Sequence, residues 1–303
     1  MRAAIFREFG PANVLEVAEM PMPKIGSKDV LVRVYASAVQ PFDVAARAGW
    51  MPSTAEVRLP VITGNEFAGE IVAMGADVDG FTVGDRVSGR HTFGCAAEYL
   101  SVPATDIARI APNLSFAQAA YLGGTGQTAH MAVEFLKVRS GDTFLIHGGS
   151  GGVGSIAVQL GVLAGARVLA TGSARNQGYL RALGAEAIIY GEGLKDRIEA
   201  AAPESVSVVL DCAGGEALDI TIALGTDKAR IATIRDYKRY KELGVQWPVG
   251  ERNGTRLAKL MELAAAGELI VHIRKTYPLE AIAEAHREVE TGHGPGKIAV
   301  LIP

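Results

Sequence analysis

Residues 145–154, Leu-Ile-His-Gly-Gly-Ser-Gly-Gly-Val-Gly, constrain the fold of this chain more than any other segment. An apolar run ends in closely spaced glycines, and the helical pattern of 155–163 follows at once. Gly149, Gly151 and Gly154 match the G-x-G-x-x-G spacing, which permits a sharp turn, close approach to a pyrophosphate and tight packing of a helix on a strand. Glycine-rich turns are common, so the flanking segments decide what this one means.

The flanking segments complete a β-α-β unit. Residues 142–147 are a short apolar run, 152–164 have helical spacing, and 166–172 form a second β-like run. We therefore expect a dinucleotide site, because the free N–H groups at the start of a helix attract phosphate. Its pyrophosphate-binding residues are predicted to be Gly149, Ser150, Gly151, Gly152, Val153 and Gly154.

The end of the second strand indicates which dinucleotide binds. Sites for NAD usually place an Asp or Glu there to accept from the ribose hydroxyls. This chain has Gly172-Ser173-Ala174-Arg175 instead, with no carboxylate to repel a 2′-phosphate. The planar donors of Arg175 suit such a phosphate, although an exposed arginine at a helix start is the structural alternative. We predict NADPH as the cofactor.

Composition narrows the class of protein. The chain has 303 residues, of which 49% are hydrophobic and 21% charged, enough for two packed domains. With a net charge of −3 and no long basic run, we expect no nucleic-acid partner and no membrane. Cys95 and Cys212 are far apart in the chain, which favours buried thiols in a reducing compartment. We expect a cytoplasmic protein that starts with a strand rather than a signal peptide.

The order of the elements predicts two domains. Before residue 112, short β-like runs separated by Gly, Pro, Asp and Asn indicate a compact barrel or meander. Ser115 to Gln118 has the form of a capping box that opens a helix. After the glycine turn, strands and helices alternate as far as Ile234, which predicts a doubly wound parallel sheet. Residues 236–252 are polar and irregular, and a helix is expected at 257–266.

Four motifs carry a resemblance to a known family: GNEFAGEI at 64–71, VGDRV at 83–87, HGGSGGVG at 147–154 and GKIAV at 296–300. The chain resembles the medium-chain dehydrogenase/reductase superfamily, and within it the zinc-free, zeta-crystallin-like quinone oxidoreductases. The resemblance implies an α/β fold, with a Rossmann domain at 113–267 and a chaperonin-10-like (GroES-like), β-rich catalytic domain made of 1–112 and 268–303. It also implies a homodimer.

The zinc positions of related alcohol dehydrogenases differ in this chain. Gln40, three residues before Asp43, stands where those relatives have a Cys, and Asn65, before Glu66, stands where they have a His. Amides match neither the thiolate nor the imidazole that a catalytic zinc prefers. Only two cysteines exist, so a four-cysteine zinc lobe is absent, and the histidines are isolated. We expect no metal.

The resemblance also implies roles for individual residues. NADPH-dependent relatives surround the 2′-phosphate with a Ser, a Lys or Arg, and a Tyr, which correspond to Ser173, Arg175 and Tyr190. Tyr190 would otherwise be a core tyrosine. Gln40 and Thr128 correspond to residues facing the nicotinamide side, and each would otherwise be a buried, hydrogen-bonded polar residue.

The implied chemistry is hydride transfer from NADPH to a small electrophilic acceptor, a quinone or an α,β-unsaturated carbonyl compound, because no Lewis acid polarises a simple carbonyl. Several relatives place a Tyr near 43–50, where this chain has none. Gln40, Arg47, water and the cofactor's ribose hydroxyl remain candidate proton donors, and Gln40 and Arg47 are the predicted catalytic residues. A non-catalytic NADPH-binding paralogue and a tailoring reductase for secondary metabolites stay open. Arg235 either meets an anionic acceptor or the cofactor phosphate, or is a solvated loop residue.

Overall fold

The chain folds into two compact units, seen in the computed structural model, which describes residues 1–51, 57–292 and 294–303. Unit 1 consists of Met1–Gln127, Arg252–His293 and Lys297–Pro303, and unit 2 of Thr128–Glu251 and Gly294–Gly296. The predicted boundaries, after 112 and before 268, differ from these. Helix α2 (Phe116–Tyr121) packs on β3 (Asp29–Val39) and β5 (Glu66–Met74), which places it in unit 1. Helix α9 (Gly254–Ala265) joins the same unit through contacts with β8 (Ile107–Arg109).

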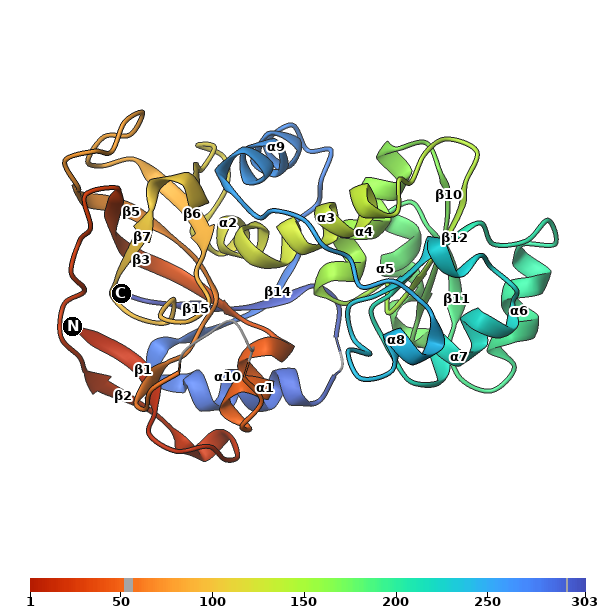
Figure 1. Cartoon of the computed structure of the whole chain (residues 1–303), viewed down its shortest axis with the longest axis horizontal. Coiled ribbons are helices and arrows are strands. Elements are labelled where there is room, and N and C mark those ends of the chain that lie inside the picture. Colours follow the sequence, from red (N-terminus) through yellow and green to blue (C-terminus); the bar gives the residue numbers. More distant parts are fainter. Residues whose placement is uncertain (52–56, 293) are drawn as a thin grey trace. The chain divides into compact units, whose positions relative to one another are not determined.

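Unit 1 is built on a seven-stranded sheet and a three-stranded sheet (Figure 1). The larger sheet has the order β14-β15-β3-β5-β6-β8, and β7 also pairs with β3. The smaller has the order β2-β1-β4. The bounds not yet given are β1 Arg2–Phe6, β2 Leu15–Glu19, β4 Val61–Ile62, β6 Arg86–Arg90, β7 Tyr99–Pro103, β14 Ile273–Pro278 and β15 Lys297–Leu301. The tail of the chain thus completes the sheet begun by the N-terminal part.

Strand β3 organises unit 1 because it pairs with β5, β7 and β15. Val30, Val32 and Val34 alternate along it toward one face and are fully buried in the main core. Side chains of an antiparallel strand alternate between faces, so this valine row fixes the register of the sheet. The β-rich catalytic domain expected from the sequence is confirmed.

Unit 2 holds a five-stranded sheet in which every pair is parallel, in the order β11-β10-β9-β12-β13. The strands are β9 Thr143–His147, β10 Arg167–Gly172, β11 Glu186–Ile189, β12 Val208–Asp211 and β13 Ile231–Thr233. The helices that accompany them are α3 Gln127–Phe135, α4 Gly152–Leu163, α5 Gln177–Ala182, α6 Leu194–Ala201, α7 Glu216–Ala223 and α8 Tyr240–Leu243. Strand order reverses at β9, where α/β sheets bind ligands outside the carboxyl ends of their strands. The predicted doubly wound sheet is confirmed.

The segment after β13 contributes little to this sheet. Residue Gln246 forms a single parallel bridge with Ala232, and the short helix α8 precedes it. Arg235 is exposed, and its side chain has no hydrogen bond or ion pair in the described part of the chain. The interpretation of Arg235 as a solvated loop residue agrees with that position. No helix among the described residues is long and apolar enough to cross a membrane.

A buried polar cluster joins helix α1 (Pro41–Arg47) to α10 (Ile282–Glu290) within unit 1. The Arg47 side chain is 1% exposed and pairs with Glu290 through one guanidinium nitrogen. Within residues 1–51, 57–292 and 294–303, its Nε and its other terminal nitrogen have no partner, and neither ring nitrogen of the fully buried His286 has one. Burial, and then the Arg47 charge, lower the pKa of His286 to about 3. His286 is therefore neutral in the folded protein.

This cluster predicts acid lability. Unfolded histidine titrates near 6.5, whereas folded His286 accepts a proton only near pH 3, so stability is complete above about 6.5 and falls as the pH drops toward 3. The loss from this residue between pH 6.5 and pH 5 is about 2 kcal/mol. Urea unfolding at pH 8 and at pH 5 measures this loss of unfolding free energy. Between these two pH values, the volume-matched variant His286→Leu should lose less than the wild type. Equal losses in the two proteins would contradict this account.

Candidate active site

The glycine turn joins β9 to α4 at the carboxyl end of the parallel sheet. A Cβ added to Gly154 would lie 2.3 Å from the Gly148 carbonyl oxygen, and one added to Gly149 would lie 2.8 Å from Ala170 Cβ. These two glycines therefore let the helix pack closely on the strands. A Cβ at Gly151 would meet only the Gly148 oxygen, at 3.4 Å, which is ordinary contact. Space is thus left beside Gly151, at the N-cap of α4.

The predicted pyrophosphate residues lie together at this helix start. Gly151 is the N-cap of α4, and Gly152, Val153 and Gly154 form its first turn. The first N–H groups of a helix lack partners within the helix and carry its positive dipole end. Ser150 is buried, its hydroxyl accepts from Asn176 Nδ2 at 3.0 Å, and its carbonyl accepts from the Gly296 N–H at 2.9 Å. The returning segment 294–296 therefore contacts the glycine turn.

The predicted 2′-phosphate residues gather at the ends of β10 and β11. The Tyr190 N–H donates to the Gly172 carbonyl at 3.3 Å, which holds the two strand ends side by side. Ser173 Oγ is buried and has no hydrogen-bond partner among the residues that the structure describes. Arg175 is exposed and forms no ion pair in the described part of the chain. Tyr190 is 51% exposed, so its interpretation as a core tyrosine is wrong.

These observations fit a phosphate-bearing ligand. An orphaned buried hydroxyl at Ser173 is costly unless a partner binds it. The unpaired guanidinium of Arg175, three residues after β10 ends, supplies the charge for that partner. Arg175 lies in a short 3-10 turn, so its position agrees with both interpretations of this residue. Thr128, the remaining predicted cofactor residue, is half-buried in the first turn of α3.

A second polar cluster lies in unit 1, around a buried ion pair. Lys297 Nζ lies 2.9 Å from Glu66 Oε1, and the two residues are 5% and 0% exposed. The ammonium also donates to Thr125 Oγ1 at 2.7 Å and lies 5.8 Å from the centre of the Tyr121 ring. The Thr125 N–H donates to Glu66 Oε2 at 2.6 Å. Each charge is therefore paired and hydrogen-bonded, as burial requires.

A π-helical turn, Leu122–Gly126, brings Thr125 to this ion pair. A Cβ added to Gly124 would lie 2.6 Å from Glu66 Oε2, and one added to Gly123 would lie 2.3 Å from the Gly89 carbonyl oxygen. The turn therefore approaches β5 and β6 so closely that only glycine fits. Such π-bulges inside helices occur frequently at functional sites.

The two amides predicted from the zinc positions are brought together beside the ion pair. Gln40 is the N-cap of α1, and its Nε2 donates a hydrogen bond to Asn65 Oδ1. Gln40 Oε1 lies 3.5 Å from the Thr125 hydroxyl, which is closer, at 3.0 Å, to Glu66 Oε2. The Gln40 N–H donates to Asp43 Oδ2 at 2.9 Å. The sequence identified these two positions as amides, and the structure shows that they are hydrogen-bonded to each other beside the ion pair.

Asp43 is nearly inaccessible, at 1% exposed, and its Oδ1 has no hydrogen-bond partner in the described segments of the chain. Burial raises the pKa of Asp43 to about 7, while the Gln40 N–H and the Lys297 charge oppose this shift. Near neutral pH the carboxyl is therefore divided between its protonated and ionised forms. Within residues 1–51, 57–292 and 294–303, no group of three His, Cys, Asp or Glu side chains is arranged to hold a metal ion.

Arg47 does not join this cluster. Its guanidinium is buried against α10 and paired with Glu290, and arginine does not give up its proton at physiological pH. The predicted catalytic role of Arg47 therefore has no support in its position. Lys297 and Thr125 were not among the site residues predicted from the sequence. A lysine opening the apolar run 298–302, together with a glutamate opening the strand 66–74, was the signal for a buried ion pair.

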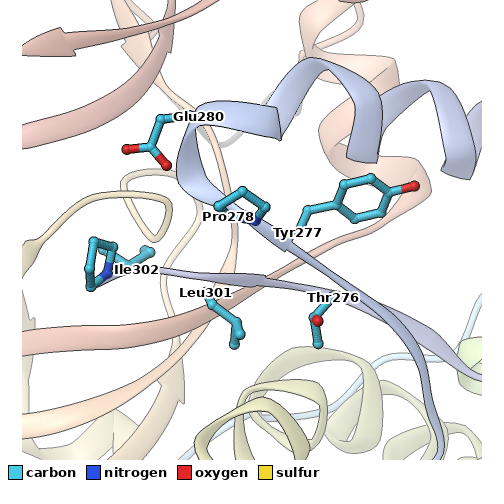
Figure 2. A pocket seen from close by; sticks show the side chains of 7 residues that line it. Thr276, Tyr277, Pro278, Glu280, Leu301 and Ile302 are labelled. Atoms are coloured by element: carbon cyan, nitrogen blue, oxygen red, sulfur yellow. The ribbon is translucent and has the colours of Figure 1, made fainter.

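A shallow pocket of about 340 Å³ lies elsewhere in unit 1, at the ends of β14 and β15. Figure 2 shows Thr276 and Leu301 extending from one side of this strand pair, with Tyr277 on the other. Glu280, also in its lining, pairs with Arg2 at 2.7 Å. None of the predicted site residues lines this pocket. Most of those residues lie instead at the glycine turn and the strand ends of unit 2 and in the polar clusters of unit 1 described above.

The glycine turn, the parallel sheet and the β-rich unit define a nucleotide-binding oxidoreductase, and comparisons with known proteins agree. The "Alcohol dehydrogenase GroES-like domain" family matches residues 26–112, and the "Zinc-binding dehydrogenase" family matches 183–300. An Arabidopsis thaliana protein, "NADPH-dependent alkenal/one oxidoreductase, chloroplastic", is 30% identical over 320 residues, covering 99% of this chain and 79% of that protein. The chain belongs to the medium-chain dehydrogenase/reductase superfamily, among its quinone-oxidoreductase-like members.

Solved structures show the same relationship. The quinone oxidoreductase from Coxiella burnetii superposes with a TM-score of 0.90 at 31% identity, covering 100% of this chain and 99% of that one. A mycobacterial protein solved in complex with NADPH has a TM-score of 0.87 at 26% identity, covering 99% of this chain and 100% of that one. Both the fold class and the family resemblance inferred from the sequence are confirmed.

The ion pair of unit 1 predicts strong coupling between its two residues. Lys297→Met leaves the Glu66 carboxylate buried without its counter-charge, which should cost about 3–5 kcal/mol of unfolding free energy. The double variant Glu66→Gln, Lys297→Met removes both charges and should recover most of that loss. Urea unfolding of the single and double variants measures the coupling. Additive losses would show that the two side chains do not depend on each other.

Proposed function

We propose that the protein is an NADPH-dependent, zinc-independent reductase that transfers a hydride to a quinone or an α,β-unsaturated carbonyl compound. The observation that carries this proposal is the hydrogen-bonded amide pair of Gln40 and Asn65, at the positions where zinc-dependent relatives have metal ligands. Neutral amides that satisfy each other form a poor zinc site. The names of the Arabidopsis and Coxiella relatives support the same acceptor classes.

The cofactor residues of the proposal lie in unit 2. Gly149 to Gly154 would hold the pyrophosphate through the start of α4, while Ser173, Arg175 and Tyr190 would surround the 2′-phosphate. The orphaned Ser173 hydroxyl and the open space at Gly151 support this fit. Bound NADPH supplies the hydride.

The acceptor class follows from charge. A carbonyl compound without conjugation needs a strong electrophile at its oxygen, and no metal ligand set is present in the described part of the chain. A conjugated acceptor needs less, because the negative charge formed on hydride addition spreads over several atoms. The protein then has to position the acceptor, exclude water and stabilise the partial charge on one oxygen.

The test of this proposal is consumption of NADPH, followed by its fluorescence, with an ortho-quinone and with a medium-chain enone. We expect consumption with at least one acceptor, and faster consumption of NADPH than of NADH. If NADPH binds but is not consumed in the presence of either acceptor, the non-catalytic paralogue is favoured instead. Cytoplasmic location is part of the proposal and is supported by two free cysteines; homodimer formation is another part, which light scattering tests.

The phosphate site gives a specific prediction. Arg175→Ala removes a charge-assisted donor to the 2′-phosphate, so the Kd for NADPH should rise about 10- to 100-fold, while the Kd for NADH changes less than about 2-fold. Arg181, an exposed arginine on α5, provides the matched control, and Arg181→Ala should leave both constants unchanged. Fluorescence titration measures them. Equal weakening for both cofactors would remove Arg175 from the phosphate site.

A further inference from the structure

We infer that Asn65 donates a hydrogen bond to the oxygen of the bound acceptor, and that Gln40 orients the Asn65 amide for this role. This inference rests on the proposed reductase function and names the group that stabilises the charge formed in it. Asn65 becomes a catalytic residue, and Gln40 a positioning residue.

The hydrogen bonds of this cluster begin at Lys297. An ammonium group can only donate, so Thr125 Oγ1 accepts from Lys297 Nζ, and the single hydroxyl proton of Thr125 points elsewhere. The acceptors within reach of that proton are the Glu66 carboxylate and Gln40 Oε1. The proton lies nearer to Glu66 Oε2, at 3.0 Å, than to Gln40 Oε1, at 3.5 Å, so Glu66 receives it, and Gln40 turns Oε1 rather than Nε2 toward Thr125. Its donor, Nε2, is left for Asn65.

The hydrogen bond from Gln40 determines how the Asn65 amide is turned. Because Gln40 Nε2 can only donate, it binds the acceptor oxygen of Asn65, Oδ1. The Asn65 amide is thereby turned so that both N–H bonds of Nδ2 point away from Gln40. Nδ2 has no acceptor in the described part of the chain. Unlike the unpaired Asp43 Oδ1, it is not fully shielded from solvent. Asn65 is 7% exposed, so a ligand oxygen can reach it.

The surroundings favour an oxygen that gains negative charge. Hydrogen-bond donors held in a water-poor site stabilise such charge without reorganising. Glu66, Thr125 and Lys297 are all nearly inaccessible, and the hydrogen bond from Gln40 Nε2 holds the Asn65 amide in one orientation. The Glu66 charge is neutralised by Lys297, which limits its repulsion of the oxyanion.

Asn65 acts during the addition of a hydride to an enone. The β-carbon receives a hydride from NADPH, a new C–H bond forms there, and the carbon–carbon π pair moves toward the carbonyl oxygen. The acceptor is reduced and the nicotinamide is oxidised. Asn65 Nδ2 donates to the enolate oxygen and keeps its protons, since an amide does not ionise. Water then supplies the proton to the α-carbon.

The first experiment is independent of turnover. The probe is 4-nitrophenolate, an oxyanion whose absorbance reports binding, titrated into the protein with NADP⁺ present. Asn65→Asp keeps an oxygen for Gln40 to bind but replaces the donor with an acceptor, so the Kd should rise at least about 10-fold. Asn13→Asp adds the same charge on the exposed surface of unit 1 and should change the Kd less than about 2-fold. An unchanged Kd in Asn65→Asp, or no binding by the wild type, would overturn the inference.

A second variant protects the test against misfolding. In Gln40→Glu, of nearly the same size, a carboxylate accepts from Asn65 Nδ2 and so withdraws the donor from the ligand. We expect it to weaken 4-nitrophenolate binding as Asn65→Asp does, with a melting temperature close to that of the wild type. If Asn65→Asp fails to fold, Gln40→Glu alone decides, and unchanged binding in it would reject the inference.

Turnover separates this inference from the proposed function. Asn65→Asp should lower kcat with an enone about 10²- to 10³-fold, as loss of one oxyanion donor does, and lower it less with an ortho-quinone, which needs less stabilisation. The Kd for NADPH should not change. A wild type that binds 4-nitrophenolate through Asn65 but consumes no NADPH would reject the reductase function and keep the donor. A working reductase whose Asn65→Asp variant matches it with both acceptors would reject the donor alone.

Discussion

The buried ion pair between Lys297 and Glu66 is the interaction on which the polar part of unit 1 depends. Two opposite charges with almost no exposure must satisfy each other, and they do so at 2.9 Å with further hydrogen bonds to Thr125. Removing either partner would leave an uncompensated charge in the core, so the pair ties three segments together: the start of β5, the π-helical turn, and the start of β15. The Gln40 and Asn65 amides lie beside this pair, and Gln40 Oε1 is 3.5 Å from the Thr125 hydroxyl.

The two units divide the chemistry between them. In the proposed function, unit 2 would bind an anion through backbone groups at the start of α4, flanked at the strand ends by a buried hydroxyl and an arginine that have no partner in the described residues. Unit 1 provides uncharged amides backed by a neutralised ion pair. A zinc-dependent relative would use metal ligands at those amide positions. In the function proposed above, this chain instead offers a hydrogen-bond donor, which is weaker than a metal and would therefore suit acceptors that spread their developing charge over several atoms.

Much of the fold could be predicted from the sequence, because local patterns carry it. The glycine spacing of 149–154 placed the turn and its helix, the capping box at Ser115 opened α2 as expected, and the β-α alternation to Ile234 gave the parallel sheet. The boundaries between the units were less predictable. Helices α2 and α9 follow the sequence pattern of any amphipathic segment, and only their contacts with β3, β5 and β8 assign them to unit 1.

For the candidate site, the sequence by itself determined which residue types stand at the cofactor turn, which amides replace metal ligands, and that no carboxylate follows β10. These follow from spacing along the chain and from the donor and acceptor groups of each side chain. Only the tertiary structure decided which of these groups meet. Lys297 lies 231 positions after Glu66, and no local pattern brings an ammonium to a carboxylate over that separation; pairing of β15 with β3 and of β3 with β5 does. Tertiary contacts likewise distinguish Arg47 from Asn65. The Arg47 guanidinium is buried and paired with Glu290, whereas Asn65 Nδ2 has no acceptor in the described residues.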